Sequence, residues 1–77
     1  MSELERMRAI AVDVLADALG VMGPIVADEV LLRLRDRANE PLMVLGESFL
    51  RLVRDELPPE VPFAAIEARI RARLRHR

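Results

Sequence analysis

Apolar residues recur at spacings of three and four along almost the whole chain, and no window alternates apolar with polar residues for long enough to form a strand. This spacing places side chains on one face of an α-helix. Glycine and proline interrupt the pattern near residues 20–24, 39–41 and 57–62. The sequence therefore predicts an all-α fold built from four helical segments.

The first helix is predicted to run from about Ser2, which suits the N-cap position, to Gly20. Its core-facing stripe consists of Leu4, Met7, Ala11, Val14, Ala18 and Met22. A second apolar stripe, on another side of the same helix, consists of Ala9, Val12, Ala16 and Leu19. One neighbouring helix cannot easily cover both stripes, so the second stripe is a candidate contact surface.

The second helix is predicted from about Pro24 to Ala38, because proline is tolerated in the first turn of a helix. Ile25 and Leu32, seven residues apart, fall on its charged side and are further candidates for a contact surface. The predicted core face consists of Val26, Ala27, Val30, Leu31, Leu34 and Ala38.

The third helix is predicted to start with Asn39 or Glu40 as its cap and Pro41 in its first turn, and to end near Glu56. Its apolar residues cover about half of the helix circumference, more than a surface helix needs. This is therefore the predicted central helix, with Phe49 at the centre of the core. The full apolar arc consists of Leu42, Leu45, Gly46, Phe49, Leu50, Leu52 and Val53.

The segment 57–62 cannot continue a helix, because each proline removes a backbone donor and disfavours helical geometry in the residue before it. The fourth helix is predicted to start near Pro62 and to have one clean apolar seam, made of Phe63, Ile66, Ile70 and Leu74. We expect a single domain over residues 1–77, a compact four-helix bundle in up-down order with connections of about three to six residues. A domain this small buries only about 60% of its unfolded surface, which favours self-association.

The residue types do not support a catalytic or a metal-binding site. There is no cysteine, and the one histidine, His76, is the next-to-last residue. Asp13 and Asp17 share a helix face but have no third ligand at suitable spacing, so they are interpreted as a solvated acidic face. We therefore expect no enzyme activity, no cofactor and no metal site.

Charge is distributed unevenly along the chain. Residues 67–77 hold five Arg and one acidic residue, whereas the whole chain has a net charge of −1. An Arg-rich end on an acidic body is either a simple solvated helix end, or it binds phosphates or the acidic surface of its own or another protein. The side chains flank both sides of the apolar seam, and no aromatic residue is interleaved to stack on bases, which favours protein ion pairs over nucleic acid. The basic candidates are Arg69, Arg71, Arg73 and Arg75.

The string from Leu19 to Val26, with Gly23-Pro24-Ile25 at its centre, is followed by Leu45, Phe49-Leu50, Leu57-Pro58 and the closing Phe63 and Ile66 seam. This pattern resembles a bacterial helical domain that has a Gly-Pro-Ile-Ala step between helices. That domain occurs at the C-termini of adenylate cyclases, serine/threonine kinases and response regulators. The resemblance covers about residues 15 to 74, and Val26 stands where the family pattern has Ala. It implies a non-catalytic association module and names no ligand.

The predicted function is a small cytoplasmic adaptor or assembly module that forms a homodimer, docks on a signalling protein, or does both. The alternative is a nucleic-acid-binding or antitoxin-like regulator that uses the Arg-rich helix. Neither a secretory signal nor an apolar run of about 18 residues is visible, so no membrane span is expected. The apolar interface candidates are Ala9, Val12, Ala16, Ile25, Leu32 and Val44.

Overall fold

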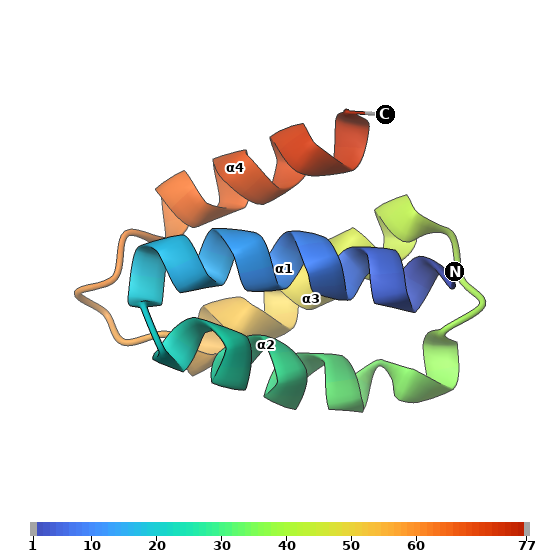
Figure 1. Cartoon of the computed structure of the whole chain (residues 1–77), viewed down its shortest axis with the longest axis horizontal. Helices are drawn as coiled ribbons and strands as arrows, with labels where there is room; N and C mark the ends of the chain where they lie inside the picture. The colour runs from blue at the N-terminus through green and yellow to red at the C-terminus, as the bar shows by residue number, and fades with distance from the viewer. Residues whose placement is uncertain (1, 77) are drawn as a thin grey trace.

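In the computed structural model, which describes residues 2–76, four α-helices follow one another along the chain. They are α1 (Glu3–Leu19), α2 (Met22–Arg33), α3 (Leu42–Glu56) and α4 (Phe63–Arg75), with a short 3-10 turn at Arg35–Arg37. Successive helices run in opposite directions, so that α1 begins and α4 ends at the same end of the bundle (Figure 1). The all-α four-helix bundle predicted from the sequence is confirmed.

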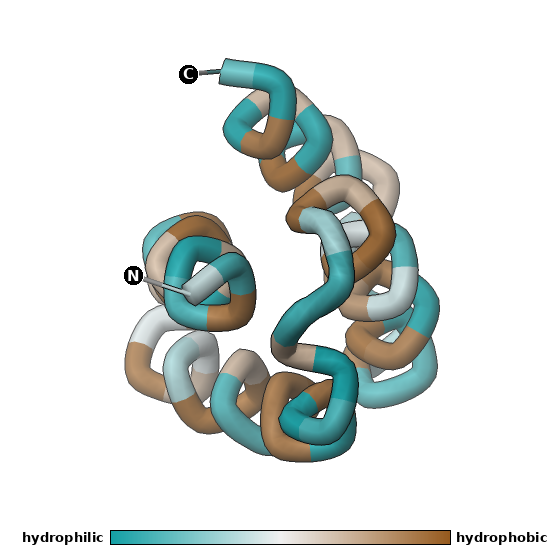
Figure 2. Tube along the Cα trace, turned by 90° about the vertical axis from the view of Figure 1, so that its right-hand side faces the viewer, coloured by the Kyte–Doolittle hydropathy of each residue, from teal (hydrophilic) through white to brown (hydrophobic). Residues whose placement is uncertain are grey.

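Two helices form the middle of the bundle. Both α1 and α3 pack against all three other helices. Viewed along the bundle, α2 and α4 lie on opposite sides of this central pair (Figure 2). The central position predicted for α3 is therefore shared with α1, and having several neighbours lets α1 place more than one apolar stripe in contact with other helices.

The core is apolar throughout the described residues, and Phe49 is the largest of the fully buried side chains. Ile10 and Leu15 of α1 are also buried, although the predicted stripes omitted them. Ala18 and Met22 were predicted to belong to the core stripe of α1, and both are exposed. Met22 is exposed because α1 ends at Leu19 and Met22 belongs to the next helix, so the stripe does not continue. Ala18 lies in the last turn of α1, beyond Leu15, the last buried residue of that helix.

The connection between α1 and α2 is tighter than predicted. Only Gly20 and Val21 separate the two helices, and Gly20 adopts φ +65°, a conformation that favours glycine. A Cβ atom added to Gly23 would lie 2.3 Å from the backbone carbon of Leu15, so the backbones of α1 and α2 are in direct contact there. Helix α2 consequently begins at Met22, and Pro24 lies within its first turn rather than at its start.

The connection between α2 and α3 is longer than predicted and spans residues 34–41. Helix α2 ends at Arg33 rather than Ala38. Neither Asn39 nor Glu40 caps α3, because the Glu40 carboxylate accepts hydrogen bonds from Arg37 at 2.7 and 2.8 Å. Pro41 occupies the N-cap position instead of the first turn. At the start of α1, by contrast, the Ser2 hydroxyl accepts a hydrogen bond from the Glu5 amide at 3.1 Å, as predicted.

Candidate functional site

The side of α2 that faces away from the core carries large apolar side chains. Ile25 and Leu32 are 56% and 61% exposed, and at 100° per residue they lie about 20° apart on the helix, opposite the buried Ala27. Val21 and Met22, also exposed, extend the same region to the start of the helix. We call these four residues the α2 outer face, which is defined as Val21, Met22, Ile25 and Leu32.

Two of the polar residues beside the α2 outer face, Asp28 and Arg33, are directed toward the rest of the bundle, whereas Glu29, which lies between Ile25 and Leu32 in the sequence, is exposed. The Asp28 carboxylate accepts a hydrogen bond of 2.8 Å from Arg8 of α1. On the other flank, the guanidinium of Arg33 lies 3.0 Å from a carboxylate oxygen of Glu56 in α3. These contacts join both flanks of α2 to its neighbours and leave the apolar residues between them open.

The remaining apolar candidates differ in exposure. Ala9 is exposed, whereas Val12 and Ala16 are half-buried and Val12 packs against the core. The second stripe of α1 is thus partly covered within the bundle. Val44 is 41% exposed in the first turn of α3, beside Met43, which lines a shallow groove with residues from the start of α1 and the end of α4.

The Arg-rich helix α4 is bound to α1 by two ion pairs. The Arg69 guanidinium lies 2.8 Å from a carboxylate oxygen of Asp17, and that of Arg73 lies 3.3 Å from one of Asp13. The sequence had been interpreted as placing both aspartates on a solvated acidic face, which is wrong in part: they are exposed but paired. The two aspartates are one helical turn apart, which matches the spacing of the two arginines.

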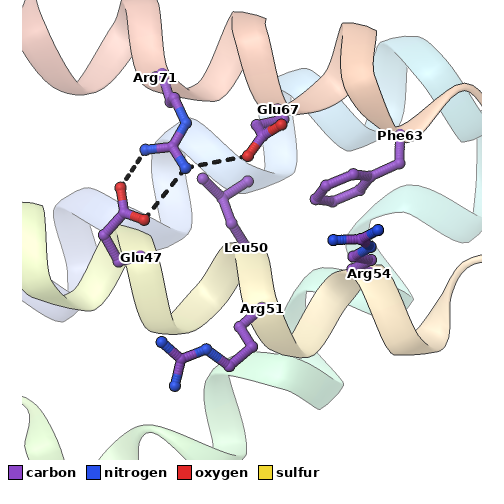
Figure 3. A pocket seen from close by; sticks show the side chains of 7 residues that line it. All are labelled: Glu47, Leu50, Arg51, Arg54, Phe63, Glu67 and Arg71. Carbon is purple, nitrogen blue, oxygen red and sulfur yellow. Dashed lines mark hydrogen bonds and ion pairs between the residues drawn. The ribbon is translucent and has the colours of Figure 1, made fainter.

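On its other side, α4 is bound to α3 through Arg71. This guanidinium donates to both carboxylate oxygens of Glu47, one of them at 3.1 Å, and to Glu67 of its own helix at 3.0 Å (Figure 3). These hydrogen bonds hold the pKa of the Glu47 carboxyl below its usual value and raise that of Arg71. Nearby, the guanidinium of Arg54 lies over the ring of Phe63, 5.7 Å from its centre (Figure 3).

Three of the four basic candidates are therefore used to attach α4 to the bundle. Arg75 is exposed and has no carboxylate partner among residues 2–76. The partners of these arginines could not be predicted from the sequence, because Asp13 and Arg73 are 60 positions apart. Within the described residues, no three side chains of the metal-binding types form a group that could hold an ion.

Comparison with protein-family models, curated proteins and solved structures gives no match for this chain. The resemblance to the Gly-Pro-Ile-Ala domain therefore stays a prediction. No described helix combines the length and apolar character needed to cross a membrane. Two surfaces therefore bear on the function, the α2 outer face and the attachment of α4.

Proposed function

We propose that this chain is a non-catalytic association module that docks on another folded protein through the α2 outer face. The observation that carries this proposal is the exposure of Ile25 and Leu32 on the side of α2 opposite the core. Single exposed apolar residues are common on proteins. A stripe of them along a helix whose opposite side already fills the core is typical of a helix that packs on both sides.

The partner surface is expected to be apolar and to have the width of one helix. Helix α2 has 12 residues and is therefore about 18 Å long. A helix face about 18 Å long and about 10 Å wide covers only about 200 Å². Such a contact buries less than the roughly 1,200 Å² of stable complexes, so we expect a transient complex. This behaviour suits an adaptor in a bacterial signalling assembly in the cytoplasm, the setting implied by the resemblance.

The nucleic-acid alternative has less support. Arg69, Arg71 and Arg73 are each within ion-pair distance of a carboxylate in the bundle. Binding to DNA phosphates would need these arginines to leave their partners, and the acidic partners would then face the phosphates.

The proposal is tested by comparing two purified variants as baits. Ile25→Ser combined with Leu32→Ser makes the α2 outer face polar while leaving the core side of α2 unchanged. The matched control is Ala64→Ser combined with Ala68→Ser, on the exposed side of α4. Proteins captured from the source lysate by the parent and by the control, but not by the α2 variant, are identified by mass spectrometry. Equal capture by all three baits would refute docking through α2.

A further inference from the structure

The groove that α4 occupies on α1 and α3 has the character of a peptide-binding site. Its α1 rim is acidic, with Asp13 and Asp17, and its α3 rim carries Glu47 beside the basic Arg51 and Arg54. Its floor belongs to the core, and α4 inserts Ile66, Ile70 and Leu74 into it. An apolar floor with carboxylates on both sides, Asp13 and Asp17 on α1 and Glu47 on α3, suits an amphipathic helix that carries Arg on both flanks of its apolar seam.

We propose that this groove also accepts α4 from a second copy of the chain, so that two copies form a dimer by exchanging their fourth helices. Because a second copy has the same sequence, its α4 has the same apolar seam and the same arginines. Every contact that α4 makes with α1 and α3 in one copy can then be formed between two copies. Exchange of an identical element is a low-cost route to a dimer, because it loses few contacts of the monomer.

The linker between α3 and α4 permits this exchange. It reverses direction through one turn, in which the Val61 amide donates a 3.0 Å hydrogen bond to the carbonyl oxygen of Pro58. Pro58, Pro59 and Pro62 prevent α3 and α4 from joining into one continuous helix when this turn opens. The opened linker is therefore extended, and its six residues span up to about 20 Å.

The polar part of the α4 attachment is weak enough to open. The carboxylates of Asp13 and Asp17 are 66% and 68% exposed, and their arginine partners are about half exposed. Exposed ion pairs are screened by salt and contribute little to stability. They do, however, determine which helix fits which groove, since like charges placed opposite one another disfavour docking.

The position of α4 also makes the exchange compatible with docking through α2. Helices α2 and α4 lie on opposite sides of the central pair (Figure 2). A dimer joined through α4 leaves both copies of the α2 outer face open. The inference thus goes beyond the proposed docking role, and neither depends on the other.

Two charge-reversed variants test the exchange. The groove variant, altered on α1, carries Asp13→Arg and Asp17→Arg. The helix variant, altered on α4, carries Arg69→Asp and Arg73→Asp. Each alone places like charges between α4 and its own groove. When the two are mixed, opposite charges meet in both grooves only if the chains exchange α4. Both variants are expected to fold, since the altered side chains are exposed and the apolar seam is intact.

The mixture is incubated at 37 °C, and the dimers are counted by native mass spectrometry, which separates the variants by mass. We expect the mixed dimer to exceed either homodimer by about tenfold, because four ion pairs form in it that neither variant forms with itself. The control combines all four substitutions in one chain, which restores the pairs within each copy. This chain is expected to disfavour mixed dimers with the parent.

Each outcome decides the proposal. A parent that dimerises while the two variants pair at random would show that the dimer uses another surface, and the exchange would be wrong. A parent and a mixture that both stay monomeric at several hundred micromolar would also overturn it. In either case the docking role of α2 is judged separately, by the capture experiment with the Ile25→Ser and Leu32→Ser bait.

Discussion

Helices α2 and α4 both pack on the central pair of α1 and α3, but they are held in different ways. Helix α2 follows α1 after two residues, and at Gly23 its backbone touches the backbone of α1. Helix α4 is attached by the side chains of one apolar seam and by ion pairs from Arg69, Arg71 and Arg73.

If α4 is exchanged between copies as proposed, this difference separates a permanent part of the bundle from an exchangeable one. Backbone contact at Gly23 leaves no room for adjustment, so α2 and α1 form one unit that keeps the α2 outer face in a constant position. Exposed ion pairs are weakened by salt and can form again with an identical partner. We therefore expect α2 to provide a fixed docking surface and α4 to be exchanged between copies.

A variant that weakens the core shared by α2 and α4 is the reference for comparing the two helices. Phe49→Ala should lower the free energy of unfolding by about 3–5 kcal/mol, because Phe49 is fully buried and the cavity cannot collapse completely. This loss approaches the total stability of a small domain. We expect α2 and α4 to melt together, with most of the mutant unfolded at 37 °C. Native helicity by circular dichroism and a melting temperature close to that of the parent would contradict a core centred on Phe49.

Replacing two glycines by alanine tests how closely α2 and α4 approach their neighbouring helices. Gly23→Ala places a Cβ atom 2.3 Å from the backbone of α1, and should cost about 3 kcal/mol, the upper part of the range for overpacking. Gly46→Ala meets only the side-chain tip of Leu74 in α4, at 2.4 Å. That tip can move, and alanine favours the helix, so the second change should cost no more than about 1 kcal/mol.

Urea unfolding of both glycine variants provides this measurement. Equal losses of stability would show that α2 and α4 are packed with the same rigidity. The contrast drawn between the two helices would then fail.

The ion pairs on the α1 side should affect α4 selectively. Asp13→Asn combined with Asp17→Asn removes two exposed pairs and should reduce global stability by no more than about 1 kcal/mol. Amide hydrogen exchange should nevertheless accelerate in residues 63–75 and stay unchanged in α2. The matched control is Asp28→Asn, which removes the pair between α1 and α2. Faster exchange of α4 in this control would show that the effect is not local.

The smallest expected effect is a change in acid sensitivity. Arg71 holds the pKa of Glu47 below its usual value in the folded state, so this pair stabilises the protein above the ordinary glutamate pKa of about 4.3. The contribution is lost as the pH falls through the lowered pKa of the folded state. Glu47→Gln should therefore make the stability of the α4 attachment less dependent on pH below about 4.

Hydrogen exchange of α4 as a function of pH tests this expectation. The control is Glu40→Gln, since Glu40 also has a lowered pKa but pairs with Arg37 in the α2–α3 connection. Only the Glu47 variant should change the pH profile of α4. Identical pH profiles of α4 hydrogen exchange for the parent and the Glu47 variant would show that the pair of Glu47 and Arg71 does not stabilise the attachment of α4.

Much of the fold followed from the local pattern of the sequence. The seam of α4 was predicted correctly, with Ile66, Ile70 and Leu74 buried and Phe63 half-buried. The burial of Phe49 was also predicted. Helical periodicity is a property of neighbouring residues, so a single sequence is sufficient to assign such faces. The ends of the helices were less accurate, because Arg37 takes up the Glu40 carboxylate that had been expected to cap α3.

The surfaces depended on the tertiary structure. The sequence presented two similar apolar stripes outside the core, one on α1 and one on α2. In the folded protein Val12 and Ala16 of the α1 stripe are half-buried, whereas Ile25 and Leu32 of the α2 stripe are exposed. Likewise, the Arg-rich end was visible in the sequence, but its partners were not. Which stripe is covered and which carboxylate meets Arg73 depend on how distant helices lie in space, and helical periodicity contains no information about that arrangement.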